Sequence, residues 1–207
     1  MLAAFTASLL MITISELGDK TFFIGVILAM RYSQRIVFTG VIAALAAMTI
    51  LSVMLGQVVS FLPEKYIHFG EIALFLGFGL KLLYDASKMS PTAECMGAKE
   101  AEVTVANSAS TDTIGLSSNL AILTQAFIMT FLAEWGDRTQ ISTIALAASY
   151  PPVGVTLGAI LGHSICTAIA VIGGKLIAGK ISERVVTAIG GLLFLIFGAV
   201  AIYEGMG

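Results

Sequence analysis

The chain has 207 residues, of which 57% are hydrophobic and only 12% are charged, with a formal net charge of −2. A water-soluble domain carries about twice that share of charged residues, so the composition excludes an ordinary globular protein and indicates an integral membrane protein. No basic tract suggests nucleic-acid binding, and the two cysteines, Cys95 and Cys166, lie too far apart to form a motif.

Six apolar runs are long enough to cross a membrane as helices, because about 20 apolar residues span the hydrocarbon core. We therefore predict an all-α integral membrane protein with six transmembrane helices. The first run does not have the features of a cleavable signal peptide, since it lacks a basic start and is too long. In chain order, the runs cover residues 2–30, 36–61, 68–88, 119–148, 152–178 and 183–204.

One six-residue motif occurs in the first run and again in the fourth. Glu16-Leu17-Gly18-Asp19-Lys20-Thr21 returns 118 residues later as Glu134-Trp135-Gly136-Asp137-Arg138-Thr139. Each copy places two carboxylates and one cation about fifteen residues into its run, which is mid-membrane at about 1.5 Å per residue. A charge at the bilayer centre costs roughly 2.5–3.5 kcal/mol. The doubled motif therefore favours an ion site over the plain alternative, two salt bridges that lock helices together.

The repeat extends beyond the motif to the whole chain. At the same offset Gly40 corresponds to Gly158 and Thr49 to Thr167, and after one inserted residue Tyr84 corresponds to Tyr203. Each half holds three predicted helices, so the two halves enter the membrane in opposite orientations, an inverted-repeat architecture typical of transporters with a midplane site. We predict a first three-helix repeat over 1–88, a cytoplasmic connecting segment over 89–118 and a second three-helix repeat over 119–207. The connection is long and shows no clear periodicity.

The basic residues predict the orientation of the chain. Outside the motifs, only Lys65 falls on the side of the N-terminus, and the other eight fall on the opposite side. Because cytoplasmic loops carry the excess of Lys and Arg, both termini are predicted to face outward, with the reverse orientation as the alternative. His68 and Glu71 then lie near the outer mouth, where water can solvate them. The eight basic residues on the side opposite the N-terminus are Arg31, Arg35, Lys81, Lys88, Lys99, Lys175, Lys180 and Arg184.

The spacing within the motif predicts that its charged groups share a helix face, because Glu16, Asp19 and Lys20 stand at positions i, i+3 and i+4. Two such helices meeting at a pseudo-two-fold axis would bring four carboxylates together. Carboxylate oxygens suit hard cations such as Ca²⁺, Mg²⁺ and Mn²⁺, and no Cys/His cluster suggests zinc or copper. Gly18 and Gly136 are points where a helix can loosen or where two helices can pack closely. The predicted cation ligands are Glu16, Asp19, Glu134 and Asp137.

The charges of the two motifs predict exchange between cations and protons. Each motif sums to −1, so the pair sums to −2. One divalent cation cancels that charge, and so do two protons, which carboxylates crowded in a low-dielectric environment bind readily near neutral pH. We therefore expect divalent cations and protons to compete for the same groups.

The doubled E-x-G-D-[KR]-[ST] motif in a six-helix inverted repeat resembles the cation/proton exchanger family of Golgi and thylakoid manganese/calcium transporters and bacterial manganese exporters, which is related to the lysine-exporter superfamily. The resemblance covers essentially the whole chain. It implies that the four acids line the cation path and that Mn²⁺ or Ca²⁺ moves against protons, with no cofactor. For a chain this short it implies a bacterial member that exports Mn²⁺ across the inner (plasma) membrane. The matching positions are Glu16, Gly18, Asp19, Lys20, Thr21, Glu134, Gly136, Asp137, Arg138 and Thr139.

Two further polar residues are weaker candidates. His163 falls midway along the fifth run, where its repeat partner is Leu45. It is either a proton relay, a soft ligand that favours Mn²⁺ over Ca²⁺, or a histidine hydrogen-bonded between helices. Gln140 follows the second motif where the first has Phe22, and it either adds an amide oxygen to the site or bridges helices.

Three other functions are left open by the sequence. A Ca²⁺/H⁺ antiporter of the same family would use the same groups. A membrane-embedded metal-dependent or aspartyl enzyme would also need acids, but a basic residue beside each aspartate opposes the shared proton of an aspartyl dyad. An amino-acid exporter would need an apolar pocket for a side chain, whereas four acids suit a bare cation. The sequence makes no prediction about the oligomeric state.

Overall fold

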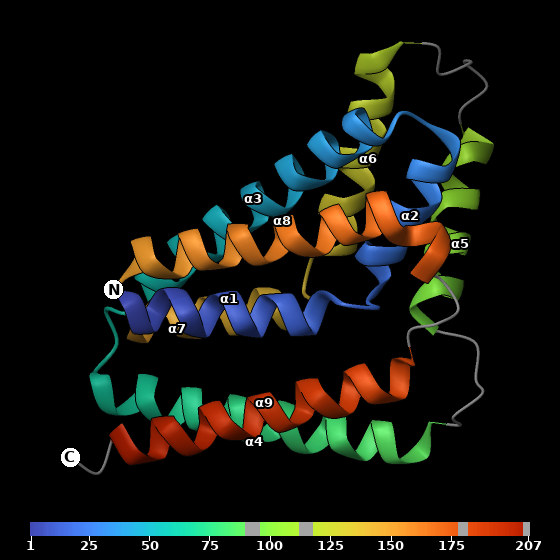
Figure 1. The fold of residues 1–207 in the computed structure, drawn as a ribbon. Coiled ribbons are helices and arrows are strands. Elements are labelled where there is room, and N and C mark those ends of the chain that lie inside the picture. Colours follow the sequence, from blue (N-terminus) through green and yellow to red (C-terminus); the bar gives the residue numbers. More distant parts are fainter. Residues whose placement is uncertain (90–95, 112–117, 178–181, 205–207) are drawn as a thin grey trace.

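A computed structural model describes residues 1–89, 96–111, 118–177 and 182–204. These residues form α-helices joined by short links, and no strand occurs among them (Figure 1). The helices are α1 (Leu2–Glu16), α2 (Lys20–Arg31), α3 (Gln34–Val59), α4 (Glu64–Lys88), α5 (Met96–Thr111), α6 (Asn119–Ala133), α7 (Arg138–Ser149), α8 (Pro152–Ile177) and α9 (Glu183–Glu204).

Within the described residues, four helices are long and apolar enough to cross a membrane by themselves: α3, α4, α8 and α9. α1 and α2 together form a fifth candidate span, bent by 64° at the short break between them, and α6 is a shorter apolar helix. The chain is therefore an all-helical, multi-pass membrane protein. The structure shows four spans, or five with the bent pair, where the sequence predicted six, because the first and fourth apolar runs are each interrupted.

The helices pack in pairs around the motif-carrying ends of α1 and α7. α4 packs along α9, α1 packs along α8, and α3 contacts α6, α7 and α8. In Figure 1 the α4–α9 pair lies on one side of α1 and α7, and α3 and α8 lie on the other side. Between α4 and α9, the rings of Phe75 and Phe194 meet edge to face, with centroids 6.0 Å apart. The ends of α1 and α7 that carry the motifs are thus enclosed by other helices.

Glycines allow two of these helix pairs to approach closely, as small residues do in membrane proteins. Gly158 of α8 lies against α1, where an added Cβ would collide with Phe5 O and Ser8 Oγ. Gly40 of α3 lies against α6, where an added Cβ would be 2.7 Å from Leu123 O. These two glycines correspond to each other in the sequence repeat, so both halves use the same position for close packing.

The connecting segment contains a helix that the sequence analysis did not predict. α5 packs against α2, and its Gly97 lies against the link between α1 and α2, where an added Cβ would be 2.8 Å from Gly18 O. Part of the connection therefore covers the first motif. Residues 90–95 and 112–117 of this segment lie outside the described residues.

Candidate cation site

The first motif lies at a break between two helices rather than within one. α1 ends at Glu16 and α2 begins at Lys20. Between them Gly18 adopts a φ of 81°, a left-handed conformation that glycine reaches without a steric penalty. The prediction that Glu16, Asp19 and Lys20 share one helix face is therefore wrong, because the glycine interrupts the helix. Of the two uses that the sequence left open for this glycine, loosening the helix is the one that its backbone conformation shows.

The second motif repeats this geometry. α6 ends at Ala133 and α7 begins at Arg138, and Gly136 adopts a φ of 79°. Asp137 caps the N-terminus of α7, because its Oδ2 accepts a hydrogen bond from the backbone N–H of Thr139 at 3.3 Å. An aspartate in this position satisfies N–H groups that the first helical turn leaves unpaired.

Three of the four predicted ligands come together. Glu16, Glu134 and Asp137 each offer a carboxylate oxygen, and these oxygens all lie within 4.8 Å of one another. Both glutamates are buried, each with 2% of its surface exposed. Cation–oxygen bonds of roughly 2.1–2.5 Å put ligands of one cation at most roughly 5 Å apart. The arrangement can therefore hold a single divalent cation.

A threonine holds each of the two glutamates. Thr21 Oγ1 donates a hydrogen bond to Glu16 Oε2 at 3.0 Å. Thr139 Oγ1 lies 3.2 Å from Glu134 Oε2 and 3.0 Å from Asp137 Oδ2, so its one proton is shared between these two acids. The two threonine–glutamate contacts occupy the same positions in the two motifs. They fix one oxygen of each carboxylate across the helix break.

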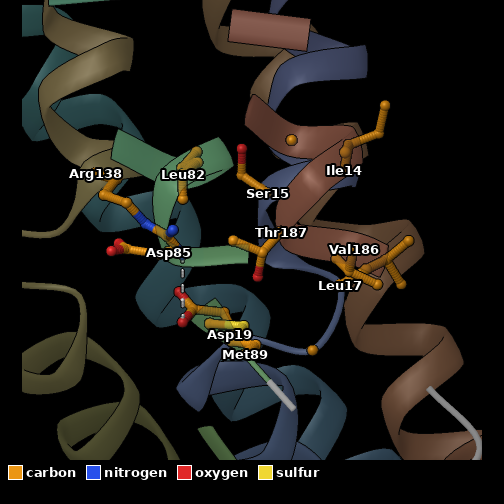
Figure 2. Close-up of a pocket in the computed structure, with 12 residues that line it drawn as sticks. Ile14, Ser15, Leu17, Asp19, Leu82, Asp85, Met89, Arg138, Val186 and Thr187 are labelled. Atoms are coloured by element: carbon orange, nitrogen blue, oxygen red, sulfur yellow. Dashed lines mark ion pairs between the residues drawn. The ribbon is translucent and has the colours of Figure 1, made fainter. Parts of the chain in front are cut away.

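The basic residues of the two motifs differ in their surroundings. Arg138 Nη2 lies 3.7 Å from Asp19 Oδ1, so this arginine reaches from the second motif to the first (Figure 2). Lys20 instead lines a groove beside α5 with Lys99 and Glu100. The fourth predicted ligand, Asp19, is therefore paired with Arg138 rather than grouped with the other three acids.

A pocket of about 100 Å³ lies beside the Asp19–Arg138 pair, where the end of α1 and the link after it face the C-terminal end of α4 and the N-terminal part of α9 (Figure 2). Its lining includes Asp85 of α4, which sequence reasoning missed because the residue stands near the end of an apolar run. The available signal was the repeat: 119 residues later the corresponding residue is Glu204, another acid. The pocket thus places a third charged side chain near the first motif.

The two weaker candidates occupy different positions. Gln140 Oε1 accepts the backbone N–H of Gly136 at 2.7 Å, and its Nε2 lies 3.1 Å from Met48 Sδ in α3. Gln140 thus bridges helices, and its amide oxygen is used by the backbone of the break. His163 lies beside the acids, with Nδ1 3.8 Å from Glu16 Oε1.

Glu71 is buried, although the sequence analysis expected water to solvate it. Glu71 is only 4% exposed, and its Oε2 accepts a hydrogen bond from Ser149 Oγ at 2.5 Å. The expected solvation of Glu71 is wrong, because α7 covers this part of α4. Its contact with Ser149 joins the N-terminal half of α4 to the C-terminal end of α7.

Buried acids from two broken helices inside a multi-pass helical protein define a membrane transporter of small cations. The chain belongs to the GDT1 family, described as divalent cation/proton antiporter GDT1, which matches residues 4–90 and 122–207. This confirms the resemblance seen in the sequence. The family transports cations and is not a family of enzymes.

Several proteins are similar over nearly the whole chain. GDT1-like protein sll0615 of Synechocystis is 57% identical over 201 residues, which is 97% of either chain. GDT1-like protein 3 of rice is 45% identical over 199 residues, covering 94% of this chain and 71% of the relative. Protein PAM71-homolog, chloroplastic, of Arabidopsis is 41% identical over 216 residues, covering 97% of this chain and 59% of the relative. No solved structure matches the chain.

Proposed function

We propose that the protein exports Mn²⁺ from the cytoplasm in exchange for protons, with the four motif acids as its cation path. The observation that carries this proposal is the group formed by Glu16, Glu134 and Asp137, whose oxygens lie within 4.8 Å. Charges buried in a membrane protein are costly without a partner. A divalent cation would cancel two of the three negative charges of this group, and protons can bind the same carboxylates, in agreement with the antiport activity of the family.

The other motif residues have supporting roles in this proposal. Gly18 and Gly136 permit the breaks, which place Glu16 at the carbonyl end of α1 and Glu134 at the carbonyl end of α6. Helix ends of this polarity suit cations in transporters. The two threonines orient the glutamates. Arg138 balances Asp19, so the two motifs keep the net charge of −2 that either one M²⁺ or two H⁺ cancels.

We propose further that the two halves form an inverted repeat. Three pairs of corresponding helices have the same lengths: 15 residues for α1 and α6, 12 for α2 and α7, and 26 for α3 and α8. The fourth pair is similar, with 25 residues in α4 and 22 in α9. Both breaks carry a glycine of positive φ at the same place in the motif. If α6 and α7 cross together as a sixth span, each half has three spans, and three spans reverse the orientation of the second half.

The proposed orientation places both termini outside and the connecting segment in the cytoplasm, following the bias of eight basic residues against one. The proposed location is the inner (plasma) membrane of a bacterium. The similarity to a cyanobacterial relative supports this location. In this orientation the pocket beside Asp19 and Asp85 is on the cytoplasmic side.

Purified protein in proteoliposomes tests the proposal. With an imposed pH gradient, Mn²⁺ should move against the proton flow without any other protein or reactant, and vesicles without the protein should show no such flux. Exclusive Ca²⁺ transport would favour the Ca²⁺/H⁺ antiporter of the same family. Failure to move either cation under any pH gradient would contradict the proposal.

A second measurement tests the proposed stoichiometry. Exchange of two protons for one divalent cation is electroneutral, so the transmembrane potential, which acts at about 2.3 kcal/mol per charge per 100 mV, should not affect the balance point. The pH gradient and voltage are set independently, and the Mn²⁺ gradient at which net flux reverses is recorded. A reversal point that moves with voltage would exclude two-for-one exchange.

A further inference from the structure

Glu16 and His163 face each other in the interior without a hydrogen bond between them. His163 is 5% exposed, and its Nδ1 lies 3.8 Å from Glu16 Oε1, which is longer than a hydrogen bond. Neither of these buried atoms has a hydrogen-bond partner in the part of the chain that the structure describes. Because buried polar atoms are nearly always paired, two that face each other unpaired indicate a ligand between them.

A small cavity lies at the same place. It measures about 10 Å³ and is lined by Glu16 and His163 together with Thr21, Cys166 and Thr167. This is close to the smallest volume that holds a single water molecule. Bonds of roughly 2.1–2.4 Å to one cation place neighbouring ligand atoms roughly 3–4 Å apart. The separation of 3.8 Å between the two side chains therefore suits adjacent ligands of one cation.

Close helix packing fixes the position of His163. A row of glycines at four-residue spacing runs along α8 and faces α1, and an added Cβ at Gly162 would lie 3.1 Å from Leu9 O. Such contact between helix backbones leaves little freedom for α8 to move along α1. The residue after this row is His163, next to the end of α1 that carries Glu16. The row consists of Gly154, Gly158 and Gly162.

The other half of the chain offers no such nitrogen. The residue that corresponds to His163 is Leu45 of α3, which is buried and lines the same cavity. His163 therefore adds one imidazole beside Glu16, and the corresponding position of the other half has none. Because leucine is accepted at the corresponding position, His163→Leu is a suitable variant.

We infer that His163 Nδ1 is a further cation ligand beside Glu16, and that this nitrogen favours Mn²⁺ over Ca²⁺. The inference rests on the proposed transport of divalent cations. Ca²⁺ takes oxygen ligands, whereas manganese also binds histidine next to glutamates, as in di-manganese carboxylate proteins. A site with carboxylates and one imidazole therefore discriminates between Mn²⁺ and Ca²⁺ better than a site with carboxylates alone.

Pulsed EPR of Mn²⁺ bound to the purified protein tests the ligand directly. The wild-type spectrum should show coupling to a coordinated ¹⁴N nucleus, and His163→Leu should lose it. The chain has two histidines, so His68→Leu, on α4, is the matched control and should keep the coupling. Bound Mn²⁺ whose nitrogen coupling is absent, or is unchanged in His163→Leu, would overturn the inference.

Transport selectivity provides the second test. In proteoliposomes, His163→Leu and His163→Gln should lower the ratio of Mn²⁺ to Ca²⁺ transport efficiency at least about tenfold, as loss of a metal-site contact typically does. A purely structural role would lower both fluxes together and leave the ratio unchanged, which would contradict the inference. A wild-type protein that moves neither cation would instead contradict the proposed function.

Discussion

Arg138 of the second motif lies 3.7 Å from Asp19 of the first, so a single ion pair joins the two copies of the repeated sequence. Lys20, which corresponds to Arg138 in the first motif, does not reach across in the same way, because it lines a groove beside α5. One arginine therefore balances an acid of the other half, and its charge enters the sum for the whole site.

Replacing Arg138 should make the reversal point of transport depend on the membrane voltage. In Arg138→Gln the net charge of the two motifs becomes −3, so a third proton should accompany the cycle and one charge should cross per cation. Mn²⁺ flux should then reverse at a point that shifts with voltage, by about 2.3 kcal/mol per 100 mV for that charge. Arg138→Lys, which keeps the charge, is the control. A voltage-independent reversal point in Arg138→Gln would show that this charge does not belong to the site.

All four motif acids should be needed for transport. Each of Glu16→Gln, Asp19→Asn, Glu134→Gln and Asp137→Asn should lower Mn²⁺ flux at least about tenfold, because each removes a negative charge from the proposed cation path. Flux in proteoliposomes is measured beside the amount of inserted protein. Glu64→Gln, at the exposed start of α4, should transport normally. Near-normal flux in two or more of the four variants would contradict a shared site.

Gly136 allows a test of the helix break itself. A Cβ there would meet nothing within 4 Å, but φ is 79°, and a left-handed conformation costs an L-residue roughly 1–2 kcal/mol. Gly136→Ala should therefore lower the thermal stability and the Mn²⁺ flux through backbone strain alone. Gly70→Ala on α4 also has free space but lies in an ordinary helix, and it should be neutral or slightly stabilising. Equal behaviour of the two variants would show that the break is not essential.

Apparent Mn²⁺ affinity should fall as pH falls. Cation binding requires deprotonated carboxylates, so protons compete with the metal. If each cation displaces two protons, the affinity decreases by up to about 100-fold per pH unit in the acidic range and becomes constant at high pH. Equilibrium Mn²⁺ binding to purified protein at a series of pH values measures this slope. Glu134→Gln, with one acid fewer, should give a shallower slope, and a slope of zero in the wild type would exclude competition.

The proposed orientation can be tested with a native thiol. Cys166 is buried, and Cys166→Ser leaves Cys95, in the connecting segment, as the single cysteine of the chain. A membrane-impermeant thiol reagent should not label this variant in intact cells and should label it after lysis. Lys65→Cys, placed in a cysteine-free background, should be labelled from outside. Labelling of Cys95 in intact cells would mean that the orientation is reversed.

The sequence predicted the membrane class, the family and a meeting of four acids, of which three come together, because charged residues in apolar runs are few and stand out. It did not predict the helix breaks, since an apolar run of the right length looks the same whether it is continuous or bent. Gly18 and Gly136 were the only signal, and a membrane glycine more commonly serves close packing. Only the backbone conformation separates these two uses.

Two other features could not be read from the sequence because they depend on tertiary packing. Glu71 stands near the start of its apolar run, a place where water normally reaches a side chain, but in the folded chain it is buried and accepts a hydrogen bond from Ser149 on α7. Likewise, α5 has a polar composition without a clear apolar stripe, and its contact with the first break depends on Gly97. Helices of this kind gain their stability from the surface on which they pack.

The three carboxylates that meet within 4.8 Å come from both halves of the chain. A chain with only one half would carry a single glutamate–aspartate pair and could not assemble this group alone. An ancestor of half the length would therefore have had to work as two associated copies. If each copy had the three spans proposed above, the two would have had to insert in opposite directions into the same membrane. Fusion of two copies into one chain would then have fixed their opposite orientations. Before the fusion, the same half-length chain would have had to insert into the membrane in both directions.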